Sequence, residues 1–207
     1  MEGIKSEIGT RQERKKALML QVLPALMGKI DTLTLIGVRD KTILLLGFAL
    51  ANRRSELVSI NIEDLEINDF GMGVRVRETK NDLIKGVVYT YNEFCPVKAT
   101  KEWIKISKIT TGALFRSIDR HGNIKERLSD KSVALIIKKY IGELGMDAND
   151  FAAHSLRSGL SSSAAMMGIT EIAIMKQTGH KTREMVDRYV QAGLRYKNNA
   201  SSILKNL

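Results

Sequence analysis

The sequence predicts an α+β fold that is mainly α-helical and contains a small antiparallel sheet. Apolar residues recur with helical spacing, most clearly between Ser129 and Gly145, whereas residues 74–77 alternate with the period of a half-buried strand. A chain of 207 residues with 43% hydrophobic residues can bury a core without disulfides, and its single cysteine, Cys95, can form none internally. These properties exclude a disordered chain and a fibrous repeat.

The first half of the chain is expected to run from helices into the sheet. Residues 15–29 are predicted as one helix and residues 40–51 as a second, which is almost wholly apolar and therefore central. A short helix should begin around Arg53. Turn residues follow, and residues 74–77 and 87–91 are predicted as paired antiparallel strands.

The second half is predicted to be helical, with most helices bounded by recognisable caps. The expected helices are residues 96–107, 129–145, 155–167, 171–178 and 182–192. Ser129 and Thr170 can cap the starts of two of them, and Gly145, Gly168 and Gly179 can close three.

The charge of the chain points to a polyanionic partner. A net charge of +10 and a pI near 9.7 favour binding to nucleic acid or to an anionic membrane surface. The apolar stretch at residues 17–27 is interrupted by Gln21 and Pro24, and nothing approaches the ~18 continuous apolar residues of a membrane span. We therefore expect a soluble, cytoplasmic protein without a membrane partner.

Two short segments place cationic side chains near a possible anion site. Arg53 and Glu56 are three residues apart, so the carboxylate can hold the guanidinium, and the apolar helix before Arg53 should anchor this arginine near the core. His154 and Arg157 have the same spacing at a helix start, where anions are favoured. The alternatives are a surface ion pair and a partly buried structural histidine beside a solvated arginine.

A third segment adds a histidine and a tyrosine. His180 follows a predicted helix end, and Tyr189 lies nine residues later in an amphipathic helix, where a tyrosine usually belongs to the core. His121 lies in a turn-forming stretch and is expected to be solvent-exposed and not catalytic. The sequence lacks the carboxylate clusters of a two-metal nuclease and the His/Cys spacings of a zinc site, so no metal or cofactor is expected.

The order of these motifs resembles the catalytic domain of the tyrosine recombinase (phage integrase) family over residues 15–195. The resemblance implies a small three-stranded sheet and a set of catalytic residues around a scissile phosphate: Arg53, Lys80, His154, Arg157, His180 and the nucleophile Tyr189. Glu56 would support Arg53. Lys85 lies in the same predicted hairpin as Lys80 and remains the alternative general acid.

The chemistry explains why these residue types are needed. Two arginines and a histidine donor, His180, can neutralise the phosphate oxygens in the transition state, where negative charge increases. His154 is the better candidate base for the tyrosine hydroxyl, and a lysine can protonate the departing 5′ oxygen. The resemblance implies a 3′-phosphotyrosyl intermediate and strand rejoining without metal or ATP.

Three departures from the family pattern are visible. Ser158 stands where many members have a histidine, and Thr178 stands where leucine often precedes Gly-His; neither position is expected to carry chemistry. Members usually have a helical core-binding domain ahead of the catalytic domain, so the chain is expected to be either a fragment or a reduced protein.

The resemblance also implies the domain organisation and the partners. Residues 1–14 are expected to be a linker remnant, residues 15–195 the catalytic domain, and residues 196–207 a tail that can dock on a neighbouring protomer. The expected partner is double-stranded DNA, bound as a homotetramer by a protein that can be a monomer in free solution. A topoisomerase-like nicking enzyme and a non-catalytic DNA-binding module are the alternatives to a site-specific recombinase.

Overall fold

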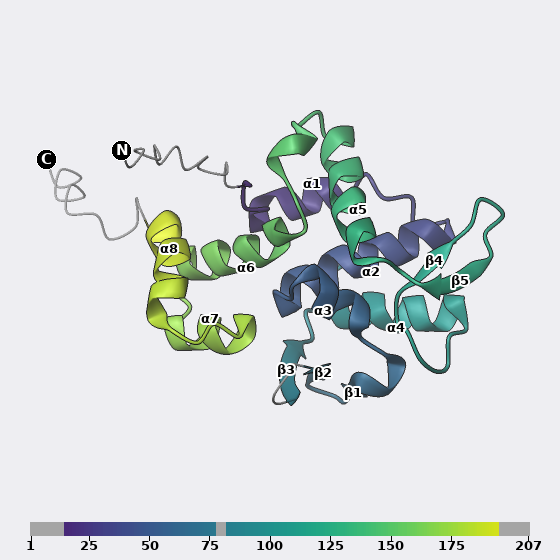
Figure 1. The fold of residues 1–207 in the computed structure, drawn as a ribbon, viewed down its shortest axis with the longest axis horizontal. Helices are drawn as coiled ribbons and strands as arrows, with labels where there is room; N and C mark the ends of the chain where they lie inside the picture. The colour runs from purple at the N-terminus through teal and green to yellow at the C-terminus, as the bar shows by residue number, and fades with distance from the viewer. Residues whose placement is uncertain (1–14, 78–81, 195–207) are drawn as a thin grey trace, which may run out of the picture.

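The computed structural model describes residues 15–77 and 82–194, and it is built around the apolar helix α2, Leu35–Leu50 (Figure 1). The side chain of Thr34 caps this helix by accepting from the Gly37 N–H at 3.0 Å. Twelve of its residues are buried, so it is central as expected. It begins five residues before the predicted start, because Gly37 and the charged pair Arg39–Asp40 in its first two turns look like a loop in the sequence.

Helices α3, α4, α5 and α6 pack against α2. The helices besides α2 are α1 (Leu23–Met27), α3 (Arg54–Ser59), α4 (Pro96–Ser107), α5 (Asp130–Glu143), α6 (His154–Met166), α7 (Glu171–Thr178) and α8 (Arg183–Leu194). Short 3-10 turns occupy Leu20–Val22, Ile62–Asp64 and Ala148–Asp150. The predicted ends of α7 are confirmed, since the Thr170 side chain accepts from the Ala173 N–H and Gly179 closes the helix at φ 73°.

The predicted three-stranded antiparallel sheet is confirmed. Its strands are β1 (Leu65–Ile67), β2 (Gly71–Arg77) and β3 (Asp82–Val88), in the order β1-β2-β3. The third strand begins at Asp82 and ends before the predicted residues 87–91 do. A second sheet, β4 (Arg116–Ile118) paired with β5 (Ile124–Arg127), has no counterpart in the sequence-based prediction.

The predicted helix at residues 15–29 is wrong over its first half. Residues 15–19 run extended along α6, where the Leu18 N–H donates to the Ser155 carbonyl at 2.9 Å. The chains approach so closely that a Cβ on Gly159 would lie 1.9 Å from the Leu18 oxygen. These hydrogen bonds replace those of a helix and fix the N-terminal segment against α6.

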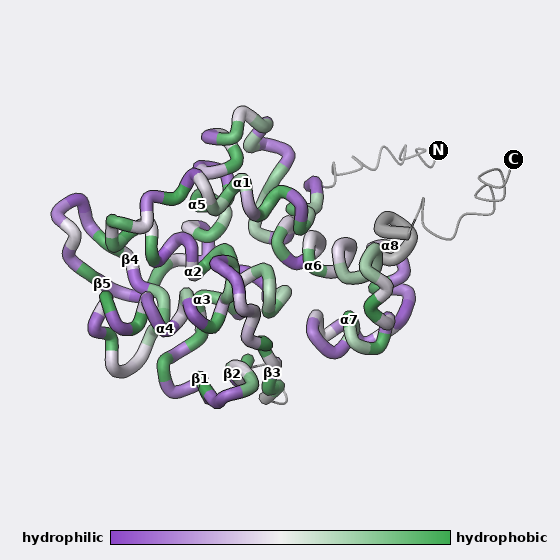
Figure 2. The backbone as a smooth tube through the Cα atoms, turned by 180° about the vertical axis from the view of Figure 1, so that it is seen from behind, coloured by the Kyte–Doolittle hydropathy of each residue, from purple (hydrophilic) through white to green (hydrophobic). Residues whose placement is uncertain are grey.

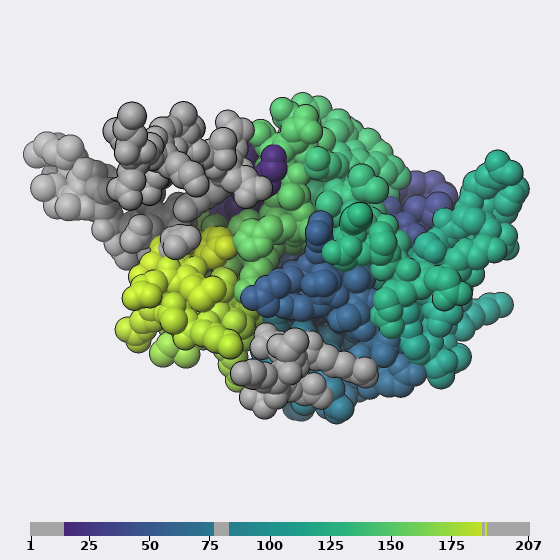
Figure 3. Space-filling view, viewed as in Figure 1, coloured from purple at the N-terminus to yellow at the C-terminus, as the bar shows by residue number. Residues whose placement is uncertain are grey.

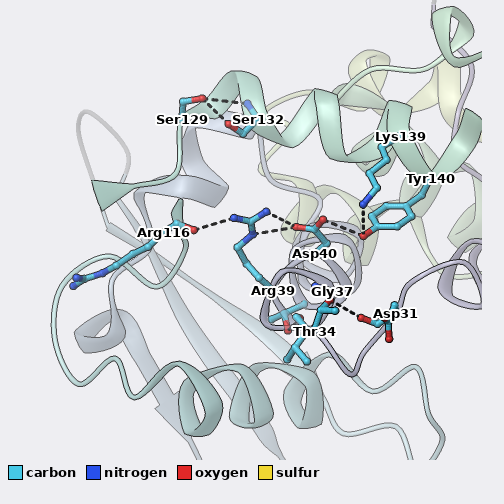
Figure 4. Close-up of polar contacts among 12 residues, drawn as sticks. Asp31, Thr34, Gly37, Arg39, Asp40, Arg116, Ser129, Ser132, Lys139 and Tyr140 are labelled. Carbon is cyan, nitrogen blue, oxygen red and sulfur yellow. Dashed lines mark hydrogen bonds and ion pairs between the residues drawn. The ribbon is translucent and has the colours of Figure 1, made fainter. Parts of the chain in front are cut away.

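A buried polar network ties α2 to α5 and β4 (Figure 4). Arg39 donates to one oxygen of Asp40 at 2.8 and 3.0 Å and to the Arg116 carbonyl at 3.3 Å, and the Tyr140 hydroxyl donates to the other Asp40 oxygen at 3.1 Å. Burial and the Asp40 charge raise the pKa of Tyr140 far above its usual range. The network thus supplies further hydrogen-bond partners to the buried Arg39–Asp40 ion pair.

Residues 15–77 and 82–194 form one large core and one small one. The large core gathers apolar side chains from α1 through α6, which we call the body. The small core consists of Ala165, Ile174 and Val186 and holds α7 and α8, which we call the C-terminal arm, against the end of α6. Figure 2 shows the arm projecting to one side of the body and joined to it by α6.

Within residues 15–77 and 82–194, no helix combines the length and the apolar character that a membrane crossing requires. Lys80 and the predicted linker and tail at residues 1–14 and 196–207 lie outside the described residues.

Candidate active site

The turn between α2 and α3 presents Arg53. The Arg53 N–H donates to one oxygen of Glu56 at 2.9 Å, and its guanidinium donates to the other oxygen of the same carboxylate. Although partial burial alone would raise it, these hydrogen bonds hold the pKa of Glu56 below its usual range. The Arg53 side chain is 55% exposed, so the expectation that it is anchored near the core is wrong; the ion pair with Glu56 holds its guanidinium.

Arg157 approaches the same turn from α6, but from inside the protein. Its guanidinium donates to the Ala51 carbonyl at 2.8 Å, and the residue is only 2% exposed. His154, one turn earlier on α6, is exposed. The alternative left open by the sequence, a partly buried histidine beside a solvated arginine, is wrong for the arginine, which is buried.

Helix α8 brings Tyr189 to His154. The Nε2 atom of His154 lies 3.0 Å from the Tyr189 hydroxyl, which is within hydrogen-bonding distance. Desolvation and the positive charges of Arg157 and Arg53 lower the pKa of His154, which favours the neutral ring. A neutral imidazole with a free lone pair on Nε2 can accept the tyrosine proton.

His180 also contacts Tyr189. The two rings are stacked, with centroids 5.7 Å apart and an interplanar angle of 18°. The His180 Nδ1 atom lies 2.8 Å from the Thr178 hydroxyl oxygen. Burial, followed by the charges of Arg157 and Arg53, lowers the pKa of His180 to about 4.

These groups come from separate elements that meet on one face. In Figure 3 the blue segment of α3 lies beside the yellow segment of α8 and the green segment of α6. The structure thus brings together five of the residues singled out in the sequence: Arg53, His154, Arg157, His180 and Tyr189.

Lys85 occupies an unusual position on β3. It is 3% exposed and shares the inner face of the sheet with buried Val87, two residues later. Its ammonium donates to the Leu50 carbonyl at 3.2 Å and to the Asn52 side-chain oxygen at 2.6 Å. Its charge also contributes to lowering the pKa of Glu56 and His180. Lys85 therefore contacts the turn that precedes Arg53 from its buried side.

Three residues that the sequence-based reasoning missed or dismissed hold this arrangement. Asn52 is 3% exposed and accepts from Lys85. Gln177 donates to the Ala49 carbonyl at 2.6 Å and to the Gly86 carbonyl at 3.2 Å, which links α7 to the body. Thr178 lies within hydrogen-bonding distance of His180, and the expectation that this position carries no chemistry stays a prediction. Of these three residues, only Thr178 had a signal in the sequence, because it stands where the family usually has leucine.

The third histidine lies elsewhere. His121 is in the β4–β5 turn and exposed, as predicted, and its N–H donates to Asp119 at 2.9 Å. In the part of the chain that the structure describes, no three His, Cys, Asp or Glu side chains are grouped so that they could hold a metal ion.

Comparison with known proteins places this arrangement in a family. The sequence profile of the phage integrase family matches residues 16–194. The chain is 41% identical over 213 residues to an integrase/recombinase xerD homolog of Selenomonas ruminantium, covering all of this chain and 62% of that protein. It is 25% identical over 194 residues to tyrosine recombinase XerA of Pyrococcus horikoshii, covering 92% of this chain and 64% of that protein.

A solved structure shares the fold. The XerH site-specific recombinase bound to a palindromic difH substrate superposes with a TM-score of 0.74 at 17% identity, covering 98% of this chain and 58% of that one. The chain thus spans about three fifths of the length of the curated relatives it matches. Because the profile covers most of the sequence, this chain belongs to the phage integrase family of tyrosine recombinases.

Proposed function

We propose that this chain is the catalytic part of a site-specific DNA recombinase that cuts and rejoins strands through a 3′-phosphotyrosyl intermediate. The observation that carries the proposal is the 3.0 Å contact between His154 Nε2 and the Tyr189 hydroxyl, with Arg53 and Arg157 close enough to lower the histidine pKa. A hydroxyl paired with a neutral base beside fixed cations is suited to attack a phosphodiester.

In the proposed reaction, the Tyr189 oxygen forms a bond to phosphorus as its proton passes to His154. Arg53, Arg157 and His180 bind the nonbridging oxygens, whose negative charge increases in the transition state. The bond to the 5′ oxygen breaks, and Lys80 protonates that oxygen as it leaves. The 5′-hydroxyl of another strand can then attack the phosphotyrosine and regenerate Tyr189, so neither metal nor ATP enters the steps.

The partner in this proposal is double-stranded DNA. The net charge of +10 favours it, and the XerH relative in fold was crystallised on its difH substrate. By analogy within the family, we propose a homotetramer on DNA in which residues 196–207 dock on a neighbouring protomer. Synapsis of two sites distinguishes this activity from topoisomerase-like relaxation of one duplex.

The test is covalent capture on nicked suicide duplexes that bear candidate target sites. We expect the wild-type chain to form an adduct that survives denaturing detergent and that also forms with a chelator present. Tyr189→Phe should form none while binding DNA with nearly unchanged affinity, because the hydroxyl adds little contact area. Tyr91, which is 94% exposed, provides the control Tyr91→Phe, which should react like wild type.

Two results would contradict the proposal. An adduct formed by Tyr189→Phe would place the nucleophile elsewhere, with Tyr196 the next candidate. A strict requirement for added Mg²⁺ would refute a site in which arginines and histidines alone meet the phosphate charge.

A further inference from the structure

The contact between Thr178 and His180 fixes more than the position of the ring. Thr178 is the last residue of α7 and is 1% exposed, and Gly179 follows in the left-handed conformation at φ 73°. This tight turn brings the His180 Nδ1 atom back to within 2.8 Å of the Thr178 hydroxyl oxygen. His180 is itself 9% exposed, so the contact is shielded from water.

The donor in this contact can be identified by counting the hydrogen atoms that Thr178 can supply. The Thr178 oxygen also lies 2.7 Å from the Ile174 carbonyl oxygen, which can only accept a hydrogen bond. Two oxygens that close need a hydrogen between them, and only the threonine hydroxyl can supply it. The threonine has one such hydrogen, so the hydrogen in the 2.8 Å contact must come from His180 Nδ1.

We propose that Thr178 is a positioning residue that holds neutral His180 as its Nδ1–H tautomer, so that Nε2 can donate to a phosphate oxygen only after His180 takes up a proton. This inference rests on the proposed function in naming the phosphate as the acceptor. The tautomer itself follows from the contacts of the free protein.

The groups around His180 couple its protonation to the binding of DNA. Four positively charged or titratable groups face it from the body: Arg157 and His154 on α6, Arg53 before α3, and Lys85 on β3. Tyr189 of α8 is stacked on the ring. The ring is neutral near pH 7, because burial and these charges lower its pKa to about 4. A phosphodiester bound among these cations adds a negative charge, which raises the pKa and draws one proton from solvent.

An aliphatic residue at position 178 would not fix the neutral tautomer of His180. Without an acceptor for Nδ1–H, the neutral Nε2–H tautomer becomes available, and it can donate to the phosphate with no proton uptake. Threonine thus makes the strength of the phosphate contact depend on pH, where leucine would not.

The direct test is the ¹⁵N spectrum of the histidine side chains in the DNA-free protein near pH 7. We expect His180 to show a protonated, pyrrole-like Nδ1 and an unprotonated, pyridine-like Nε2, and Thr178→Ser, which keeps the hydroxyl, to show the same. In Thr178→Val, which keeps the branched shape, the two nitrogens should exchange character. A pyridine-like Nδ1 in the wild-type protein or in Thr178→Ser would overturn the proposal, whether or not the valine variant folds.

A second measurement tests the coupling to DNA. In the Tyr189→Phe background, calorimetric titration with a nicked duplex in buffers of different ionisation enthalpy should give uptake of about one proton per site. The uptake should fall towards zero when Thr178→Val is added. Equal uptake in both would contradict the assigned role of Thr178. Failure of every duplex to yield an adduct with wild type would instead count against the proposed function, and the ¹⁵N result would stand.

Discussion

The body and the C-terminal arm contribute different kinds of group to the candidate site. The body holds the cations: Arg53 directly precedes α3, and the buried Arg157 donates to the Ala51 carbonyl. The arm carries His180 and Tyr189, the proposed nucleophile, and its core consists of Ala165, Ile174 and Val186.

This difference indicates how the site divides its tasks. Charge stabilisation in a transition state works best when the donors are fixed before the reaction, which a large core provides. A tyrosine that becomes covalently attached to a strand benefits from a small support that can shift without disturbing the cations. The Gln177 hydrogen bonds to Ala49 and Gly86 connect the arm to the body beside the cations.

The largest expected effect distinguishes Lys80 from Lys85, the two candidates for the general acid. Loss of a general acid slows a reaction by roughly 10²–10⁴-fold, and a sulfur leaving group removes the need for that acid. Lys80→Ala should therefore cleave ordinary DNA slowly and DNA with sulfur in place of the bridging 5′ oxygen at close to the wild-type rate. Lys85→Met should be slow on both substrates, because buried Lys85 holds the Leu50–Asn52 turn.

Single-turnover cleavage of the two substrates measures this difference. Rescue of Lys85→Met together with failure to rescue Lys80→Ala would make Lys85 the acid. If neither variant is rescued, the proton comes from another group.

A somewhat smaller effect distinguishes the two arginines. Arg53→Lys and Arg157→Lys should each slow cleavage by roughly 10²–10³-fold, because lysine cannot reproduce the fork that binds two oxygens. Only Arg157→Lys should also lower the free energy of unfolding, by about 1.5–3 kcal/mol, since it loses a buried charged hydrogen bond to Ala51.

Chemical denaturation of both variants measures the stability difference. Equal losses of stability would mean that the exposed and the buried arginine are held alike, and the distinction between them would fail.

The sequence predicted the arm better than the start of the body, for local reasons. Helix α7 is bounded by the side chain of Thr170 and by Gly179, both visible as caps in the sequence. Helix α2 begins before its predicted start because Arg39 and Asp40 form an ion pair with each other inside the fold. The polarity of single residues cannot reveal such a pair. The short strands β4 and β5 are largely polar and give little alternation to detect.

Within the site, the sequence supplied residue types and order but not their burial. The motif of His154 and Arg157 was predicted to face an anion, yet which of the two is buried depends on the Ala51 carbonyl, far away in the chain. The role of Thr178 depends on a two-residue turn through a left-handed glycine, which brings two side chains together that no helical periodicity would pair.

The smallest expected effect compares two left-handed residues, one in each region. Ala51 ends α2 at φ 50°, and Gly179 ends α7 at φ 73°. The left-handed conformation costs a non-glycine residue roughly 1–2 kcal/mol. In the body that cost is offset by the hydrogen bonds of the turn, since Lys85 binds the Leu50 carbonyl and Arg157 binds that of Ala51.

Ala51→Gly should therefore change the free energy of unfolding by less than about 0.5 kcal/mol, because relief of strain is balanced by greater freedom of the unfolded chain and the loss of a buried methyl group. Gly179→Ala should destabilise the protein by about 1 kcal/mol and move His180 relative to Thr178, since the small core of the arm has little packing to offset the strain. Thermal unfolding, together with hydrogen exchange of the α7 and α8 amides, measures both variants. Faster exchange confined to the arm in Gly179→Ala would agree with a separate, weaker unit. Faster exchange throughout the body would show that the arm and the body unfold as one.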